Sequence, residues 1–156
     1  MLWLKERGYD LLHKSLFDYS DFTKNGGEYL IREFGEDIDS WQIKHSNIPL
    51  EQQRSAHLIE SGVWHLEEPS IEDITQHLAD GYLVRCLINS AKLNNREGYV
   101  GHSIIISDFD DDGFTIQDPG LPPIENRKVK YADFEAAWAC PNKEAKELDA
   151  IRKINS

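Results

Sequence analysis

The chain has 156 residues, of which 40% are hydrophobic, and 17 basic against 28 acidic side chains give a formal net charge of −11. A chain of this length and composition is expected to fold as one globular domain with its own core. The acidic balance argues against nucleic acid and anionic membrane surfaces as partners, because both attract Lys and Arg, and no apolar run approaches the roughly 20 residues that span a bilayer.

The first ten residues, MLWLKERGYD, carry three charged side chains where a signal peptide would need its apolar stretch. We therefore expect a cytoplasmic protein. Apolar residues 2–4, followed by a charged triplet and Gly8, are typical of the last turns of a helix that ends at a glycine. A helix this short is marginal alone, so the sequence begins as though in the middle of an element.

Periodicity and turn residues predict helices mainly in the first half of the chain and strands mainly in the second. The clearest local signal is the pair Ser70 and Asp73, which forms a capping box before a helix that Gly81 ends. In chain order, the predicted elements up to residue 98 are a strand over 9–16, a helix over 18–34 interrupted at Gly26-Gly27, an ambiguous segment over 36–46, a helix from Pro49 to Gly62, a strand over 63–68, a helix over 70–81, a strand over 82–89 and a polar loop over 90–98.

Beyond that loop, the pattern predicts two strands within 101–118 separated by an acidic turn, a short strand over 127–131 and a short helix over 132–139. This order of elements is typical of an α+β fold in which helices pack on an antiparallel sheet.

His102 opens the first of the two central strands and Asp118 closes the second. In hydrolases with a Cys or Ser nucleophile, a histidine acts as general base and an acidic side chain orients its imidazole. A two-residue loop at the acidic turn would place His102 opposite residue 123, so contact with Asp118 requires a turn centred near Asp110 or a bulge. The local pattern therefore leaves open whether the pair is catalytic or is an ordinary strand histidine and turn aspartate.

The acidic turn Asp108-x-Asp110-x-Asp112-Gly113 matches the opening of a calcium-binding loop. That loop needs a glutamate eleven residues after its first aspartate, and position 119 is a proline. We therefore interpret the segment as a hairpin turn in which Asp-Gly supplies a positive φ. The six histidines and two cysteines show no zinc spacing, so we expect no metal site and no cofactor.

The segment GYVGHSIIISDFDDDGFTIQDPG, followed by VKYADFEAAW, resembles the C-terminal half of the C39-like peptidases, which are cysteine peptidases of the papain fold. In that family, Gly-His opens one strand, a turn rich in Asp and Gly follows, and Asp-Pro closes the next strand at the spacing seen between His102 and Asp118. The segment SIEDITQHLADGYLVRCLINS is similar to the helix and buried strand that come before. The likeness covers residues 63–140 well and the earlier residues loosely, and a family of cyclase-like proteins with a papain-type layout shares much of the pattern.

The resemblance implies that His102 is the general base and Asp118 its orienting acid, within one papain-like α+β domain over residues 1–156 whose N-terminal helices pack on a C-terminal antiparallel sheet. The family's nucleophilic cysteine begins an N-terminal helix, and an oxyanion-hole glutamine lies a few residues before it. This chain has no cysteine before Cys86 and no glutamine before Gln42. We therefore expect a domain that is N-terminally incomplete relative to the family.

None of the other candidate nucleophiles has a suitable context. Cys86 alternates with apolar residues of a buried strand and is interpreted as core. Cys140 follows the histidine and the aspartate in the sequence, against the family order, and neither Ser15 nor Ser20 has a recognisable nucleophile context. The two cysteines form no disulfide framework, so we expect both to be reduced.

Two further residues are candidates for substrate binding. The absence of a side chain at Gly101 would let a peptide backbone approach, although a glycine there also relieves a bulge. Asn89 ends a buried strand and is either a polar cleft residue or a strand-end cap.

These observations predict a C39-like domain that keeps the base and the acid, lacks the nucleophile, and binds a peptide without cleaving it, because loss of a triad nucleophile costs about 10⁶-fold in rate. Two alternatives stay open. The chain is a truncated form of an active peptidase, in which case the DNA before Met1 encodes a Gln…Cys-Gly segment, or it is an acidic protein–protein interaction module. A sheet face left bare by the missing helix would be apolar and would favour a homodimer.

Overall fold

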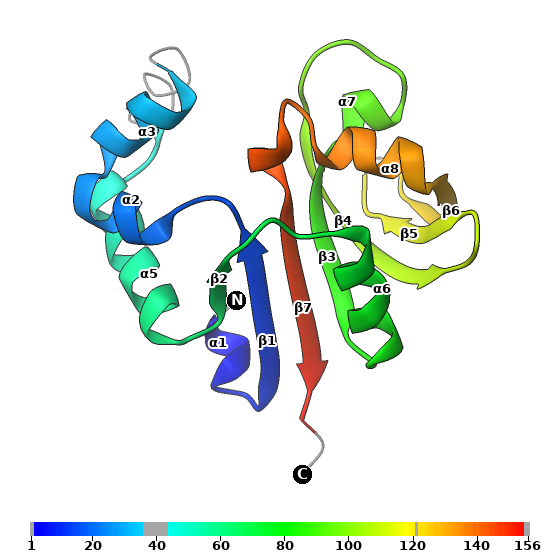
Figure 1. Ribbon diagram of the computed structural model, residues 1–156, viewed down its shortest axis with the longest axis horizontal. Helices are drawn as coiled ribbons and strands as arrows, with labels where there is room; N and C mark the ends of the chain where they lie inside the picture. The colour runs from blue at the N-terminus through cyan, green and yellow to red at the C-terminus, as the bar shows by residue number, and fades with distance from the viewer. Residues whose placement is uncertain (1, 36–43, 121, 155–156) are drawn as a thin grey trace. The chain divides into compact units, whose positions relative to one another are not determined.

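The computed structural model describes residues 2–35, 44–120 and 122–154, and their fold is mixed α+β, as predicted (Figure 1). They divide into two compact units, one within residues 1–16 and 65–156 and the other within residues 17–64. The single domain expected over residues 1–156 stays a prediction, because compact units of this kind also occur inside one domain.

A seven-stranded sheet with the order β2-β1-β7-β3-β4-β5-β6 organises the larger unit. The pairs β1–β7, β7–β3, β3–β4, β4–β5 and β5–β6 are all antiparallel. The strands are β1 (Tyr9–Ser15), β2 (Trp64–Leu66), β3 (Leu83–Asn89), β4 (Gly101–Phe109), β5 (Gly113–Asp118), β6 (Ile124–Lys130) and β7 (Glu147–Lys153). The helices of this unit are α1 (Leu2–Lys5), α6 (Ile71–Ala79), α7 (Ser90–Leu93), α8 (Tyr131–Trp138) and the 3-10 helix η1 (Lys143–Ala145).

The capping box predicted for α6 is confirmed. The Ser70 hydroxyl accepts a hydrogen bond from the backbone N–H of Asp73 at 3.1 Å, and the Asp73 carboxylate accepts one from the backbone N–H of Ser70 at 2.9 Å. The polar loop expected over 90–98 is wrong in its first part, because residues 90–93 form α7. The Asn89 side chain begins this short helix by accepting hydrogen bonds from the N–H groups of its first turn.

The core lies between one face of the sheet and helices α6 and α8, which pack on that face (Figure 1). Side chains alternate between the two faces of a strand, and on β3 the apolar set is Val84, Cys86 and Ile88, all fully buried. Helix α6 contributes Ile74, and α8 contributes Trp138. The interpretation of Cys86 as a core residue is therefore confirmed.

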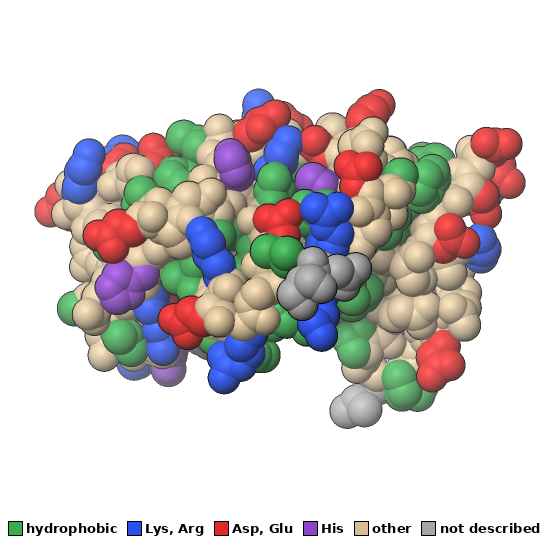
Figure 2. Space-filling model, turned by 90° about the horizontal axis from the view of Figure 1, so that it is seen from below, with side chains coloured by type: hydrophobic (Ala, Val, Ile, Leu, Met, Phe, Trp, Pro, Cys, Tyr) green, Lys and Arg blue, Asp and Glu red, His purple; other side chains and the backbone are tan. Residues whose placement is uncertain are grey.

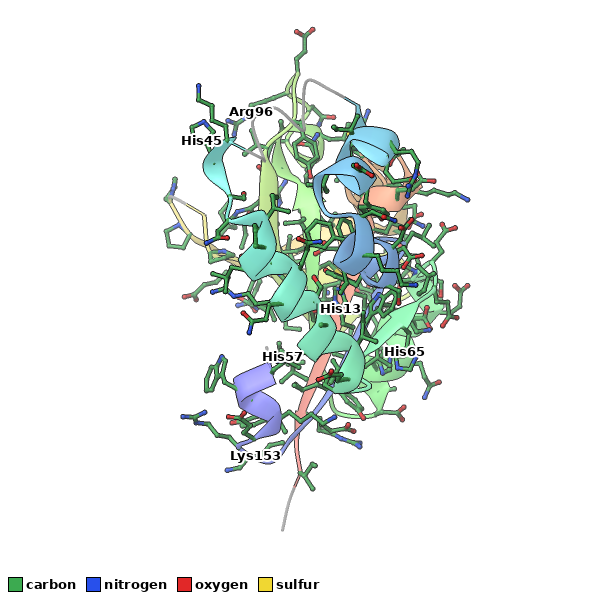
Figure 3. All side chains as sticks on the ribbon, turned by 90° about the vertical axis from the view of Figure 1, so that its left-hand side faces the viewer. His13, His45, His57, His65, Arg96 and Lys153 are labelled. Carbon is green, nitrogen blue, oxygen red and sulfur yellow. The ribbon has the colours of Figure 1, made fainter. Side chains whose placement is uncertain are left out.

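The opposite face of the same strands carries a polar network. The Asp149 carboxylate on β7 is hydrogen-bonded to His13 Nδ1 on β1 at 2.6 Å and accepts a second hydrogen bond from Arg85 Nε on β3, and Figure 3 labels His13. The Arg85 guanidinium also donates to the Ser103 hydroxyl on β4 at 2.8 Å. The sequence predicts a bare apolar face that would favour a homodimer, whereas this face of the sheet carries polar and charged side chains. The homodimer itself stays a prediction.

The smaller unit contains α2 (Tyr19–Asn25), α3 (Gly27–Phe34) and α5 (Ile48–Glu60), as the sequence predicts. Aromatic rings hold it together: the ring centroid of Phe17 lies 5.4 Å from that of Phe22 and 5.0 Å from that of Tyr29. The Asn47 side chain caps the N-terminus of α5, whose first turn contains the expected Pro49. Residues 36–43, most of the segment that we considered ambiguous, lie outside the described residues.

The hairpin of β4 and β5 is closed by the acidic turn and contains a bulge. Phe109 pairs with Phe114, and the register then shifts between Ile106 and Asp108. In the turn, the Asp110 carboxylate accepts hydrogen bonds from the backbone N–H groups of residues 112 and 113. This side chain, rather than a positive φ, organises the turn.

The expectation that Gly113 supplies a positive φ is wrong, because its backbone lies outside the left-handed region. The glycine is needed for a close approach of two strands instead. A Cβ atom at this position would lie 2.1 Å from the carbonyl oxygen of Val129 and 2.8 Å from the Cα of Lys130, both in the backbone of β6.

Candidate functional site

The candidate site lies at the end of the sheet where β3 ends and β4 begins. His102 is the second residue of β4, and Asp118 is the last residue of β5. The distance between His102 Nε2 and Asp118 Oδ1 is 2.6 Å, which is a short hydrogen bond. The contact that the sequence suggested between the imidazole and the carboxylate is therefore present.

The bulge in β4 determines which residues meet. Beyond it, Ile105 pairs with Gln117, and continuing this register places His102 opposite Gly120. His102 and Asp118 are therefore diagonal neighbours across the two strands, which long side chains can bridge. A Cβ atom at Gly120 would lie 3.0 Å from Asp118 Oδ1 and 3.8 Å from the imidazole, so the glycine leaves space for the carboxylate rather than for the ring.

Asp118 is held as a carboxylate. Burial of this side chain, which is 9% exposed, opposes ionisation. Hydrogen bonds from His102 and from the backbone N–H of Gly120, the latter at 3.0 Å, outweigh that effect and hold the pKa of Asp118 below its ordinary value. The Arg127 guanidinium on β6, 3.6 Å from Asp118 Oδ2, adds to the stabilisation of the charge.

The ionised carboxylate fixes the protonation of the neutral imidazole. Because Asp118 accepts the hydrogen bond, His102 Nε2 carries the proton and Nδ1 keeps its lone pair. The His102 side chain is 24% exposed, and within the described ranges Nδ1 has no hydrogen-bond partner. This arrangement can accept a proton or a hydrogen bond from a ligand at Nδ1.

Asn89 shapes the backbone next to His102. Its side chain is 1% exposed, and it cross-links the strand end, α7 and the loop that follows. Its carbonyl oxygen accepts hydrogen bonds from the N–H groups of Ala91, Lys92 and Val100, and its amide donates to the carbonyl of Gly98 and the sulfur of Cys140. The capping role is thus present in the structure, whereas a substrate-binding role for Asn89 stays a prediction.

Gly101 pairs with Asn89 across β3 and β4 and is exposed. Its φ is not in the left-handed region, and a Cβ atom there would lie 3.5 Å from the Tyr99 ring, which is an ordinary contact. The backbone therefore tolerates other residues at this position. A role of Gly101 in peptide binding stays a prediction.

The structure places neither cysteine as an activated nucleophile. Cys86 is fully buried in the core, and burial raises the pKa of its thiol well above the ordinary value. Cys140 is half-buried, and its sulfur accepts a hydrogen bond from the Asn89 amide at 3.2 Å. Both thiols are free. Of the two serines considered, Ser15 lies fully buried on β1 and Ser20 lies on α2 of the smaller unit.

Cys86 is expected to stay unmodified when the native protein is treated with iodoacetamide, because alkylation requires an accessible thiolate. Peptide mapping by mass spectrometry should show carboxamidomethylation at Cys86 only after addition of denaturant. Cys140 serves as the internal control, because its partial exposure predicts faster modification under native conditions. Rapid native labelling of Cys86 would contradict both its placement in the core and its exclusion as a nucleophile.

Sequence reasoning missed two features of this end of the sheet. One is Arg127, whose contact with Asp118 depends on an irregular register between β5 and β6 that no local pattern signals. The other is a hollow of about 320 Å³ beside α7, which the sequence does not indicate because its pattern predicts a polar loop over residues 90–98. The hollow is lined by Ser90, Ala91, Asn94, Arg96, Glu97 and Val100.

Within the ranges that the structure describes, no group of three or more His, Cys, Asp or Glu side chains is arranged to hold a metal ion. The helices in those same ranges are too short or too polar to cross a bilayer. The sequence matches no protein-family model and none of the curated proteins with which it was compared.

Proposed function

We propose that this chain contains a papain-type domain, similar to the C39-like peptidases, that binds a peptide beside His102 and does not cleave it. The observation that carries the proposal is the hydrogen bond between His102 Nε2 and Asp118 Oδ1, which leaves Nδ1 as an acceptor for a ligand. The proposal also rests on the sequence resemblance over residues 63–140.

The order of elements around the pair supports the papain-type assignment. Helix α6 precedes β3, the strand β4 begins with the Gly-His pair, β5 ends with the aspartate, and α8 follows after β6. This is the order that the resemblance leads us to expect. A base near the start of one strand and an acid at the end of its antiparallel neighbour can form a hydrogen bond only if the strand register brings them together. The register of β4 and β5 does so for His102 and Asp118.

Binding without turnover is favoured by the state of the thiols. Peptide cleavage by this chemistry requires a thiolate beside the imidazole. Cys86 is buried with a raised pKa, and the Cys140 sulfur is engaged by Asn89. The same His102–Asp118 pair would act as base and orienting acid if a thiol were brought to Nδ1 from outside the described residues.

The expected mode of binding follows from the protonation of the pair. Nδ1 of a neutral imidazole accepts a hydrogen bond, and a peptide backbone offers an N–H donor at almost every residue. The negative charge of Asp118 polarises the ring and makes Nδ1 a better acceptor. We therefore propose that a peptide N–H donates to His102 Nδ1 in the complex.

The alternative of an acidic interaction module is less well supported. Such a module would gather acidic side chains on a continuous surface. Figure 2 shows acidic and basic side chains interspersed over the face that it draws, with apolar side chains between them. The negative net charge is therefore not concentrated on that face.

The proposal is tested with a phage-displayed library of random dodecapeptides selected against the immobilised chain. The selected peptides are then synthesised and their affinities measured by calorimetry. His102→Ala should weaken binding about tenfold, which corresponds to the free energy of one lost hydrogen bond to a polarised group. The matched control is His65→Ala, an exposed histidine on β2, which should leave the affinity unchanged. Failure to enrich any peptide, or equal binding by the His102 and His65 variants, would overturn the proposal.

A further inference from the structure

The hollow beside α7 lies outside the hydrogen-bonded pair of the candidate site. Its lining comes from α7, from the loop that follows and from Val100, the last residue before β4. Figure 3 shows Arg96 near one end of the sheet and Lys153, the last residue of β7, near the opposite end. All the lining residues belong to the larger unit.

Two residues of opposite charge are among those that line this hollow. Arg96 and Glu97 both line it, and neither side chain forms an ion pair or a hydrogen bond with the rest of the described chain. They also do not pair with each other, although they are adjacent in the sequence. Most other basic side chains near the sheet differ in this respect: Arg85, Arg127 and Lys146, for example, each contact a carboxylate.

Polar and apolar groups complete the lining. The Asn94 amide donates to the carbonyl of Ser90 at 2.7 Å, and its own side-chain oxygen is left without a hydrogen bond from the described residues. Ala91 and Val100 supply apolar surface. A ligand that satisfies this lining needs an anionic group, a cationic donor and a short apolar part.

We infer that the hollow binds a free amino acid with an aliphatic side chain. The guanidinium of Arg96 would take the α-carboxylate, for which its planar pair of donors is suited. The carboxylate of Glu97 and the side-chain oxygen of Asn94 would take the α-ammonium group, and Ala91 and Val100 would contact the side chain. A volume of about 320 Å³ accommodates a ligand of this size.

This inference is independent of the peptide site proposed above. It uses none of the atoms of His102 or Asp118, and the ligand is a zwitterion rather than a chain of peptide groups. Because both charges of the hollow are open to solvent, we expect a dissociation constant of about 1 mM, typical of a small ligand held by exposed charge pairs.

The probes are L-leucine, N-acetyl-L-leucine and L-leucinamide, titrated into the isotopically labelled full chain and followed by two-dimensional amide NMR. L-leucine should produce saturable shifts in residues 90–100. N-acetyl-L-leucine lacks the ammonium group and L-leucinamide lacks the carboxylate, so each should bind at least about fivefold more weakly. Saturation with equal affinity by either blocked analogue would overturn the inference, as would the absence of saturable shifts with L-leucine at about 20 mM, far above the expected constant.

Variants of the chain provide the matched test. Arg96→Gln and Glu97→Gln should each weaken the binding of L-leucine at least about fivefold. Lys92→Gln is the control, because this exposed lysine lies on α7 but does not line the hollow. His102→Ala should bind L-leucine like the parent chain, so failure of the peptide proposal and failure of this inference give different results. Equal weakening by Lys92→Gln and Arg96→Gln would contradict a specific site.

Discussion

Replacing Gly113 by alanine is expected to lower the free energy of unfolding by about 3 kcal/mol, the upper range for inserting atoms where no space exists. The added Cβ would lie 2.1 Å from the carbonyl oxygen of Val129. That oxygen belongs to the backbone of β6, so it cannot move aside as a flexible side chain would. The strands β5 and β6 would have to separate at the pair formed by Gly113 and Lys130.

The matched control is Gly101→Ala, in which the same atoms are added to a strand glycine that has space for them. The nearest atom to the added Cβ is 3.5 Å away, in the Tyr99 ring. Since alanine restricts the unfolded chain more than glycine does, this variant should be as stable as the parent chain or up to about 1 kcal/mol more stable. Urea unfolding followed by circular dichroism measures both, and similar midpoints for the two variants would contradict the close approach at Gly113.

The substitution Asp149→Asn is also expected to cost about 3 kcal/mol, because it removes a buried carboxylate to which two side chains from neighbouring strands are hydrogen-bonded. The carboxylate is 2% exposed and connects three strands through its bonds to His13 and Arg85. The asparagine amide has the same shape as the aspartate carboxylate but only one acceptor oxygen. Its NH₂ group would face groups that are themselves donors, so one of the existing hydrogen bonds would be lost. Glu51→Gln is the control, since the pair of Glu51 with Arg54 is well exposed and should contribute less than about 1 kcal/mol.

The pH dependence gives a second measure of Asp149. Burial opposes its ionisation, but the contacts with His13 and Arg85 outweigh burial and lower the pKa in the folded state. A carboxyl group whose pKa is lowered on folding stabilises the fold above its unfolded pKa of about 3.9 and loses that effect as the pH falls through the folded value. The difference in unfolding free energy between the parent chain and Asp149→Asn should therefore shrink as the pH falls below about pH 4. A difference that grows on acidification would contradict this role.

Local signals predicted the elements that local chemistry controls. The capping box at Ser70 begins α6, and Gly81 follows its end, where its positive φ is suited to a helix terminus. The alternation of apolar residues around Cys86 predicted a buried strand, and β3 is one. In these cases the residues that determine the structure lie within one or two turns of each other.

The strand β7 was missed, although it lies between β1 and β3. Its sequence, ELDAIRK, has only two core-facing apolar residues, Leu148 and Ala150, between charged ones. The local pattern predicts that a charged residue such as Asp149 is exposed. Its burial is explained by its partner His13, which lies 136 residues away in the sequence. Long-range pairing of this kind leaves no local pattern.

For the candidate site, the sequence supplied the two residues but not their geometry. Counting from a tight turn placed His102 five positions out of step with Asp118. The contact exists because of the longer turn organised by Asp110 and the bulge between Ile106 and Asp108. A bulge depends on how two strands pack against their surroundings, so the residues near it did not reveal the contact.

The position of β7 in the middle of the sheet constrains how the molecule is made. During synthesis, β1 emerges from the ribosome long before its hydrogen-bonding partner at residues 147–153, since the paired residues His13 and Asp149 are 136 positions apart. Until then, β1 and β3 each present an unsatisfied edge to the cell, because the strand that separates them does not yet exist. The sheet therefore closes only after β7 has been made, and the open edges of β1 and β3 are where the nascent chain is most exposed to mispairing.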